Sequence, residues 1–185
     1  MRKSSMRVPT EKTARYLELV AIFGAFALFL STIEYLIPKP LPFIRIGLAN
    51  LPILVSLPVL PVPYILLLAG IKIVGQGLIN GTMFSYIFLF SLAGSLASAG
   101  VMVLLHRTVG KRITLLGISV LGALASNAVQ LFLARLIIIG EGALLIAPPF
   151  LGVGLVTSIV LGLFAVRFTS VSRWYRGLLQ AEDRA

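Results

Sequence analysis

Residues 38–52 read PKPLPFIRIGLANLP, and they open a long apolar run, residues 47–105, in which Lys72 is the only charged side chain. Prolines set the backbone of the opening segment, because each fixes φ and lacks an N–H donor. Arg45 and Asn50 place a guanidinium and a carboxamide where a lipid-facing sequence should have neither. The stretch therefore predicts a membrane protein that keeps polar groups in order to bind something with them.

Composition supports the membrane class. Hydrophobic residues make up 58% of the 185 residues and the mean hydropathy is +1.04, whereas soluble domains are about 45–50% apolar. We expect an all-α integral membrane protein with one membrane domain, residues 1–185. The chain has no cysteine and a single histidine, His106, so disulfides, thiolate chemistry and a histidine-rich metal site are excluded. No cofactor is expected.

The net charge of +10 could indicate nucleic acid, but the position of the charges argues against it. Most lysines and arginines lie in three clusters that bracket the apolar runs, as the positive-inside rule expects. We therefore attribute the charge to topology and expect lipid, not nucleic acid, as the partner. The clusters comprise Arg2, Lys3, Arg7, Lys12 and Arg15; Arg107, Lys111 and Arg112; and Arg167, Arg173, Arg176 and Arg184.

Span lengths and charge clusters together predict six transmembrane helices with both termini in the cytoplasm. A helix needs about 20 apolar residues to cross, and three crossings between residues 47 and 105 return the second basic cluster to the cytoplasm. The second helix is short and proline-bearing, so it could be tilted, broken or partly re-entrant. Residues 1–14 and 168–185 are expected to be cytoplasmic. The predicted helices are 15–36, 48–60, 63–79, 83–105, 113–134 and 142–166.

Polar residues from several predicted helices converge on the outer half of this bundle. Lys72 lies near mid-membrane, and Gln76 and Asn80 follow on the same helix face because residues four apart are neighbours. Asn127 and Gln130 occupy the outer half of the fifth helix. Three further polar residues lie at the outer ends of the first two helices: Glu34, Arg45 and Asn50.

Two interpretations of these polar residues remain open. They could form an outward-facing pocket for an anionic or strongly polar ligand, which the positive charges of Lys72 and Arg45 favour. Alternatively, Glu34 pairs with Arg45 or Lys72, and the amides of residues such as Gln76 and Asn127 join helices to one another. We favour binding for the two cations, and neither interpretation is preferred for the amides.

Small residues form a second pattern. Stripes on the fourth and fifth helices predict close helix packing rather than ligand contact; they comprise Ser91, Gly94, Ser95 and Ser98, and Gly122 and Ser126. On the first helix, Ala21 and Ala25 lie four apart. That face could pack internally or dock another membrane protein, and spacing alone favours internal packing.

The segments FIRIGLANLPIL and IKIVGQGLINGTMFSYIFLFSLAGSLAS resemble the Gx transporter family, whose members carry the name heptaprenyl diphosphate synthase component I. The resemblance covers about residues 34–130. The family is similar to the S components of energy-coupling factor (ECF) transporters, six-helix proteins that capture vitamins from outside. These proteins assemble with a membrane coupling protein and two ATPases.

The resemblance implies an importer subunit in the bacterial cytoplasmic membrane. Arg45 and Asn50 would lie at the substrate-facing mouth, and the KxxxQ…NGT string adds Lys72, Gln76, Asn80 and Thr82 to the binding site. An alanine-rich face on the first helix of S components contacts the coupling protein. The resemblance therefore strengthens the expectation that Ala21 and Ala25 dock a partner protein. Vitamin-binding S components often carry an acidic residue in the region of Lys72, so their ligands do not transfer to this chain.

Whether this chain could itself catalyse prenyl transfer can be judged from its residues. Prenyl elongation needs aspartate-rich motifs that hold magnesium and diphosphate, and Asp183 is the only aspartate here. The chain also lacks a GxxxxGK[ST] nucleotide loop, so any ATP-driven step must come from partners. We expect no enzyme activity from this chain alone. Two alternatives remain: a membrane subunit of a flavin or quinone redox system, and a non-catalytic partner of a prenyl synthase in isoprenoid metabolism.

Overall fold

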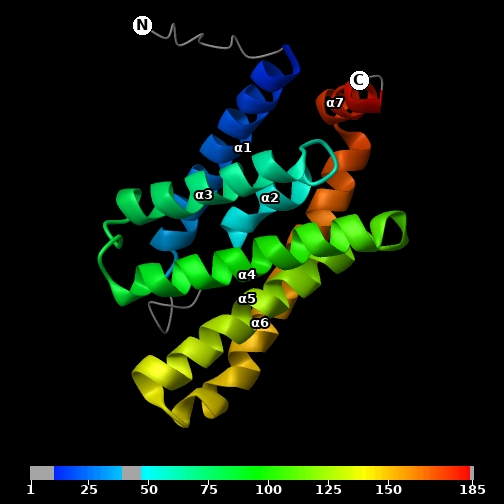
Figure 1. The fold of residues 1–185 in the computed structure, drawn as a ribbon. Coiled ribbons are helices and arrows are strands. Elements are labelled where there is room, and N and C mark those ends of the chain that lie inside the picture. The colour runs from blue at the N-terminus through cyan, green and yellow to red at the C-terminus, as the bar shows by residue number, and fades with distance from the viewer. Residues whose placement is uncertain (1–10, 39–46, 184–185) are drawn as a thin grey trace, which may run out of the picture.

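The computed structural model describes residues 11–38 and 47–183, and these residues form helices joined by short connections, with no strand among them. Five helical stretches are long and apolar enough to cross a membrane. The chain is therefore an all-helical, multi-pass membrane protein (Figure 1). The stretches are α1 (Glu11–Leu36), α3 (Val62–Ile79), α4 (Tyr86–Thr108), α5 (Leu115–Ala134) with its π-helical extension η3 (Arg135–Ile139), and α6 (Gly142–Val171).

The segment predicted to form the second crossing, residues 48–60, has a shorter helix in the structure than expected. It consists of one 3₁₀ turn, η1 (Leu48–Asn50), followed by the short helix α2 (Leu51–Ser56). Every residue of α2 is buried, and at 1.5 Å per residue such a segment spans far less than the roughly 30 Å hydrocarbon layer. The chain thus has five full-length candidate spans within the described residues, and α2 is a short helix enclosed by them.

The helix ends follow local chemistry. Thr114 caps α5 by accepting a hydrogen bond from the N–H of Gly117 at 3.2 Å. Gly81 (φ +64°) and Gly140 (φ +53°) adopt left-handed φ values that favour glycine, and these two residues end α3 and η3. The boundaries of α1 and α6 extend beyond their predicted ranges of 15–36 and 142–166.

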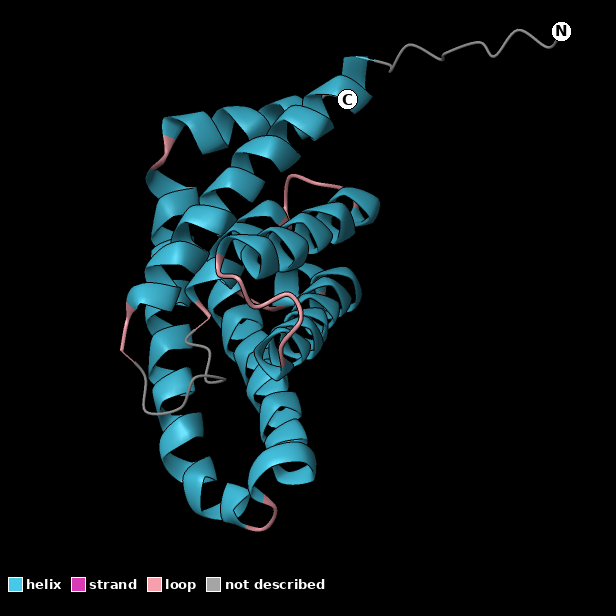
Figure 2. Ribbon diagram, turned by 90° about the vertical axis from the view of Figure 1, so that its left-hand side faces the viewer, coloured by secondary structure: helices cyan, strands magenta, loops and turns pink. Residues whose placement is uncertain are grey.

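The two described ends of the chain meet at one end of the bundle. A guanidinium N–H of Arg15, near the start of α1, donates to the carbonyl of Leu178 at 3.1 Å. Leu178 belongs to the last helix, α7 (Arg173–Asp183). At the opposite end, the α5–α6 hairpin projects beyond the other helices (Figures 1 and 2). The start of α1 and the last helix therefore lie on the same side of the protein.

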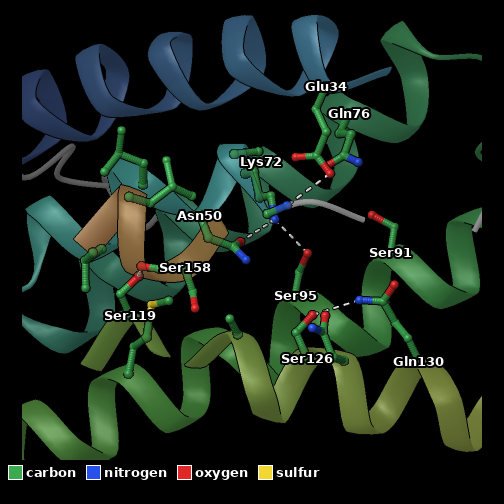
Figure 3. A pocket seen from close by; sticks show the side chains of 18 residues that line it. Glu34, Asn50, Lys72, Gln76, Ser91, Ser95, Ser119, Ser126, Gln130 and Ser158 are labelled. Carbon is green, nitrogen blue, oxygen red and sulfur yellow. Dashed lines mark hydrogen bonds between the residues drawn. The ribbon is translucent and has the colours of Figure 1, made fainter. Parts of the chain in front are cut away.

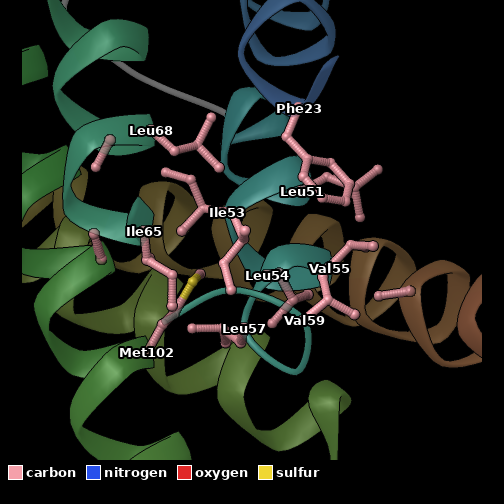
Figure 4. Packing of buried hydrophobic residues seen from close by; sticks show 14 of the residues in the cluster. Phe23, Leu51, Ile53, Leu54, Val55, Leu57, Val59, Ile65, Leu68 and Met102 are labelled. Carbon is pink, nitrogen blue, oxygen red and sulfur yellow. The ribbon is translucent and has the colours of Figure 1, made fainter. Parts of the chain in front are cut away.

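The apolar core surrounds α2 (Figure 4). Phe23 of α1, Leu68 of α3 and Met102 of α4 belong to the same buried cluster as α2. Tyr175 of α7 reaches this core, with 0% of its surface exposed, and its hydroxyl donates to the Val55 carbonyl at 2.8 Å. The α7 helix is therefore tied directly to α2.

Small residues on α1 face two ways. Gly24 is buried against α3, with Ile71 and Leu68 in contact range of any added Cβ. Ala21 and Ala25 are exposed on the outer surface of α1. The spacing-based preference for internal packing of these alanines is therefore wrong, because Gly24 makes the close helix contact instead.

Candidate functional site

Lys72 is buried in the middle of α3, with only 3% of its surface exposed. Its ammonium donates to Oδ1 of Asn50 and to the hydroxyl oxygen of Ser95, each at 2.7 Å. An unsatisfied lysine at the bilayer centre costs roughly 2.5–3.5 kcal/mol on insertion scales. These contacts explain how the charge is kept inside the bundle (Figure 3).

The η1 turn is held in place by side chains from two other helices. The carboxylate of Glu34, in the last turns of α1, accepts a hydrogen bond from the N–H of Gly47 at 3.2 Å. The Nδ2 of Asn50 donates to the hydroxyl of Ser98 on α4 at 3.4 Å. In Figure 3 the side chains of Glu34 and Gln76 converge with Lys72 on the same space. The half-buried Asn50 side chain thus joins Lys72 of α3 to Ser98 of α4.

A second polar group lies on α5. The Nε2 of Gln130 donates to the Ser126 hydroxyl at 2.9 Å, while Oε1 of Gln130 and Nδ2 of Asn127 are buried with no hydrogen-bond partner among the described residues. Burying such a group unpaired costs about 1–3 kcal/mol. Two adjacent turns of α5 therefore carry hydrogen-bonding capacity that residues 11–38 and 47–183 do not use.

Glycines on the neighbouring helices make room for these amides. A Cβ at Gly94 of α4 would lie 2.8 Å from both Nε2 of Gln130 and the Ser126 hydroxyl. A Cβ at Gly154 of α6 would collide with Nδ2 of Asn127. The amides fit between the helices because these two positions lack side chains.

These groups surround one cavity between the helices. The space within it for water-sized molecules is about 30 Å³, enough for one or two waters, so a larger ligand requires its walls to move apart. Hydroxyl, amide, ammonium and carboxylate groups all line it. The lining polar side chains are Glu34, Asn50, Lys72, Gln76, Ser91, Ser95, Ser119, Ser126, Asn127, Gln130 and Ser158.

The structure brings together six of the nine residues predicted to bind substrate: Glu34, Asn50, Lys72, Gln76, Asn127 and Gln130. Asn80 and Thr82 do not line the cavity, because they belong to the turn between α3 and α4, where the N–H of Thr82 bonds to the Gly77 carbonyl at 2.9 Å. Arg45 lies outside the described residues.

Serines were assigned to helix packing by their spacing, and this interpretation missed part of their role. Ser95 accepts a hydrogen bond from Lys72, Ser98 accepts one from Asn50, and Ser91 lines the cavity. A Ser91–Ser95–Ser98 stripe on one helix face, opposite a buried lysine, was the signal available in the sequence. The stripe both permits close packing and supplies hydroxyls.

The cavity brings opposite charges close together, with the Lys72 ammonium and the Glu34 carboxylate among its lining groups. Among the described residues, no group of three His, Asp or Glu side chains could hold a metal ion. The arrangement is suited to holding a polar solute by hydrogen bonds and charge.

A sequence model of the family named heptaprenyl diphosphate synthase component I matches residues 23–168. None of the curated proteins or solved structures compared with the chain matches it. The matched residues include α2, α3, α4 and α5, which carry most of the cavity. The chain therefore belongs to the heptaprenyl diphosphate synthase component I family.

Proposed function

We propose that this protein is the substrate-binding, S-component-like membrane subunit of an ECF-type importer. It captures a small polar or anionic solute in the cavity around Lys72. The observation that carries the proposal is the pair of buried, unpartnered amide atoms on Asn127 and Gln130 beside a buried ammonium. Proteins hydrogen-bond nearly all their buried polar groups, so unused capacity in a polar cavity favours a ligand.

We further propose that the cavity opens to the outside of the bacterial cytoplasmic membrane, and that both termini are cytoplasmic. Support comes from the bond between Arg15 and Leu178, which joins two basic ends of the chain, together with the positive-inside rule. In this topology the η1–α2 segment takes the place of the second of six crossings, although α2 alone is too short to span the hydrocarbon layer.

Ala21 and Ala25 are proposed as the docking face for the coupling protein. Both are exposed on α1, and a stripe of small residues allows a partner helix to approach closely. The partner would supply the energy through its ATPases, since this chain has no nucleotide loop.

The family name favours one alternative, a non-catalytic membrane subunit linked to isoprenoid metabolism; a link to flavin or quinone redox metabolism is the other form of this alternative. Under this alternative the protein copurifies with a soluble prenyl synthase or retains a coloured flavin or a quinone. In neither case does the chain catalyse prenyl transfer itself, because its only aspartate is Asp183.

Native mass spectrometry of gently purified protein tests the proposal, reading retained small molecules and copurified subunits together. The wild type is expected to carry a polar adduct and to copurify with a coupling protein and two ATPases. Lys72→Met should lose the adduct, whereas Lys12→Met, on the exposed start of α1, should keep it. Retention of the same adduct by Lys72→Met and by Asn127→Leu would rule out this cavity as the binding site.

A further inference from the structure

A second cavity, separate from the polar one, lies between α1, α2, α6 and α7. We refer to it as the lateral groove. Its space for water-sized atoms is about 130 Å³, against about 30 Å³ around Lys72, and its lining surface is entirely apolar. The lining residues are Ile22, Phe23, Phe26, Leu51, Pro52, Val55, Phe164, Phe168 and Trp174.

The floor and the rim of the lateral groove differ in exposure. Leu51, Pro52 and Val55 of α2 form a buried floor. The rim is exposed, with Ile22 on α1 at 52% and Phe164 on α6 at 51% of their surfaces. In a membrane-spanning bundle the groove therefore opens sideways, between α1 and α6, toward the hydrocarbon of the bilayer.

Two arginines are sequence neighbours of the residues at one end of the groove. Trp174 of α7 closes that end, with its ring 6.2 Å from the ring of Phe23 in an edge-on arrangement. Arg167 and Arg173 directly precede the groove residues Phe168 and Trp174, and both arginines are exposed. Exposed arginines one residue away from Phe168 and Trp174 are within side-chain reach of this end, and guanidinium groups pair with phosphate by charge-assisted hydrogen bonds.

We propose that the lateral groove binds one acyl chain of an anionic phospholipid, whose phosphate lies at Arg167 and Arg173. The apolar lining matches the chain and the two arginines match the charge of the headgroup. The site does not depend on the importer role, because it shares only Leu51 with the polar cavity.

Trp174 is the only tryptophan in the chain, so all tryptophan fluorescence comes from this end of the groove. We would reconstitute the protein in phosphatidylcholine vesicles that contain increasing fractions of phosphatidylglycerol brominated on its acyl chains. A parallel series uses brominated phosphatidylcholine. Half-maximal quenching is expected at a several-fold lower mole fraction of the anionic lipid. Superimposed curves would overturn the proposal, because general contact with surrounding lipid quenches equally in both series.

Two pairs of variants locate the effect. Ile22→Phe adds bulk at the rim and should weaken quenching, whereas Leu66→Phe, equally exposed at 53% but on α3, should not. The double variant Arg167→Gln/Arg173→Gln should abolish the preference for the anionic lipid, whereas Arg112→Gln, exposed and outside the groove, should preserve it. Thermal unfolding curves confirm that each variant is folded.

Other occupants give different results. If a second copy of the chain covers the groove, the protein elutes as a dimer and Trp174 is shielded from both brominated lipids. That outcome, or full quenching with wild-type preference in the double arginine variant, would overturn the proposal.

Discussion

The ammonium of Lys72 donates a 2.7 Å hydrogen bond to Oδ1 of Asn50, which joins the middle of α3 to the turn that begins the short α2 segment. Hydrogen bonds to charged groups contribute about 1.5–3 kcal/mol, and removing one partner strands the other in the interior. Asn50→Leu and Lys72→Met should each lower the free energy of unfolding. The double variant should lose less than their sum, measured by denaturant titration in detergent. Strictly additive losses would contradict the coupling.

A substitution at Asn127 should affect ligand binding without lowering the stability of the protein. Its Nδ2 is buried without a partner, so Asn127→Leu removes an unpaired polar group at similar side-chain size. We expect the unfolding free energy of the ligand-free protein to stay unchanged or rise by about 1 kcal/mol. Retention of the polar adduct in native mass spectrometry should fall. A variant that is less stable yet retains the adduct would indicate that Asn127 is structural.

Gly154 and Gly152 provide a matched pair on α6. A Cβ at Gly154 collides with the Asn127 side chain, whereas a Cβ at Gly152 meets nothing within 4 Å. Gly154→Ala should destabilise the protein by about 1–3 kcal/mol through overpacking. Gly152→Ala should be neutral or stabilise it by up to about 1 kcal/mol, since alanine has the higher helix propensity. Unfolding midpoints in detergent measure both, and equal effects would contradict the close contact between α5 and α6.

We expect the unfolding free energy to depend on pH through Tyr175 of α7. Burial raises the pKa of the Tyr175 hydroxyl above its ordinary value of 10.0. Because the folded protein holds this proton more tightly than the unfolded chain, the stabilisation is complete below pH 10 and is lost as pH rises above it. Tyr175→Phe should lower stability by about 1 kcal/mol at neutral pH and should lack this alkaline loss. The exposed Tyr35→Phe serves as the control, and unfolding free energies across pH 8–11 provide the measurement.

The exposed alanines on α1 test the partner proposal. Ala25→Trp should leave the unfolding midpoint unchanged, because the residue is exposed, but should block copurification with the coupling protein by filling the space for a partner helix. Leu66→Trp, exposed on α3, should have neither effect. Copurification that survives at wild-type yield with Ala25→Trp would remove this face from the interface.

Much of the architecture could be predicted from composition and spacing. An apolar content that only lipid can cover predicted the membrane class, and the predicted helix 63–79 agrees with α3 to within one residue. Lys72 and Gln76 could be placed on one helix face because the helical repeat brings residues four apart together. Family membership also follows from the sequence, through strings such as RIGLANLP.

Other features were decided only by tertiary packing. The prolines indicated a short second helix, but span arithmetic could not show that α2 is fully enclosed, because a buried short helix and a lipid-facing crossing share the same apolar composition. Nor could spacing show that Gly24 faces α3 while Ala25 faces outward, since small residues suit either surface.

The roles of the serines and of Asn127 depended likewise on which helix lies opposite. A hydroxyl is part of a packing contact or part of a polar wall according to its neighbour, and Ser95 meets the ammonium of Lys72. An amide becomes an unpaired group only when the surrounding helices leave it without a partner, as they do for Nδ2 of Asn127. The sequence by itself therefore determined that this protein is embedded in lipid, where its helices lie, and which polar residues they carry. Only the tertiary structure decided which of those residues meet, because that depends on contacts between distant helices.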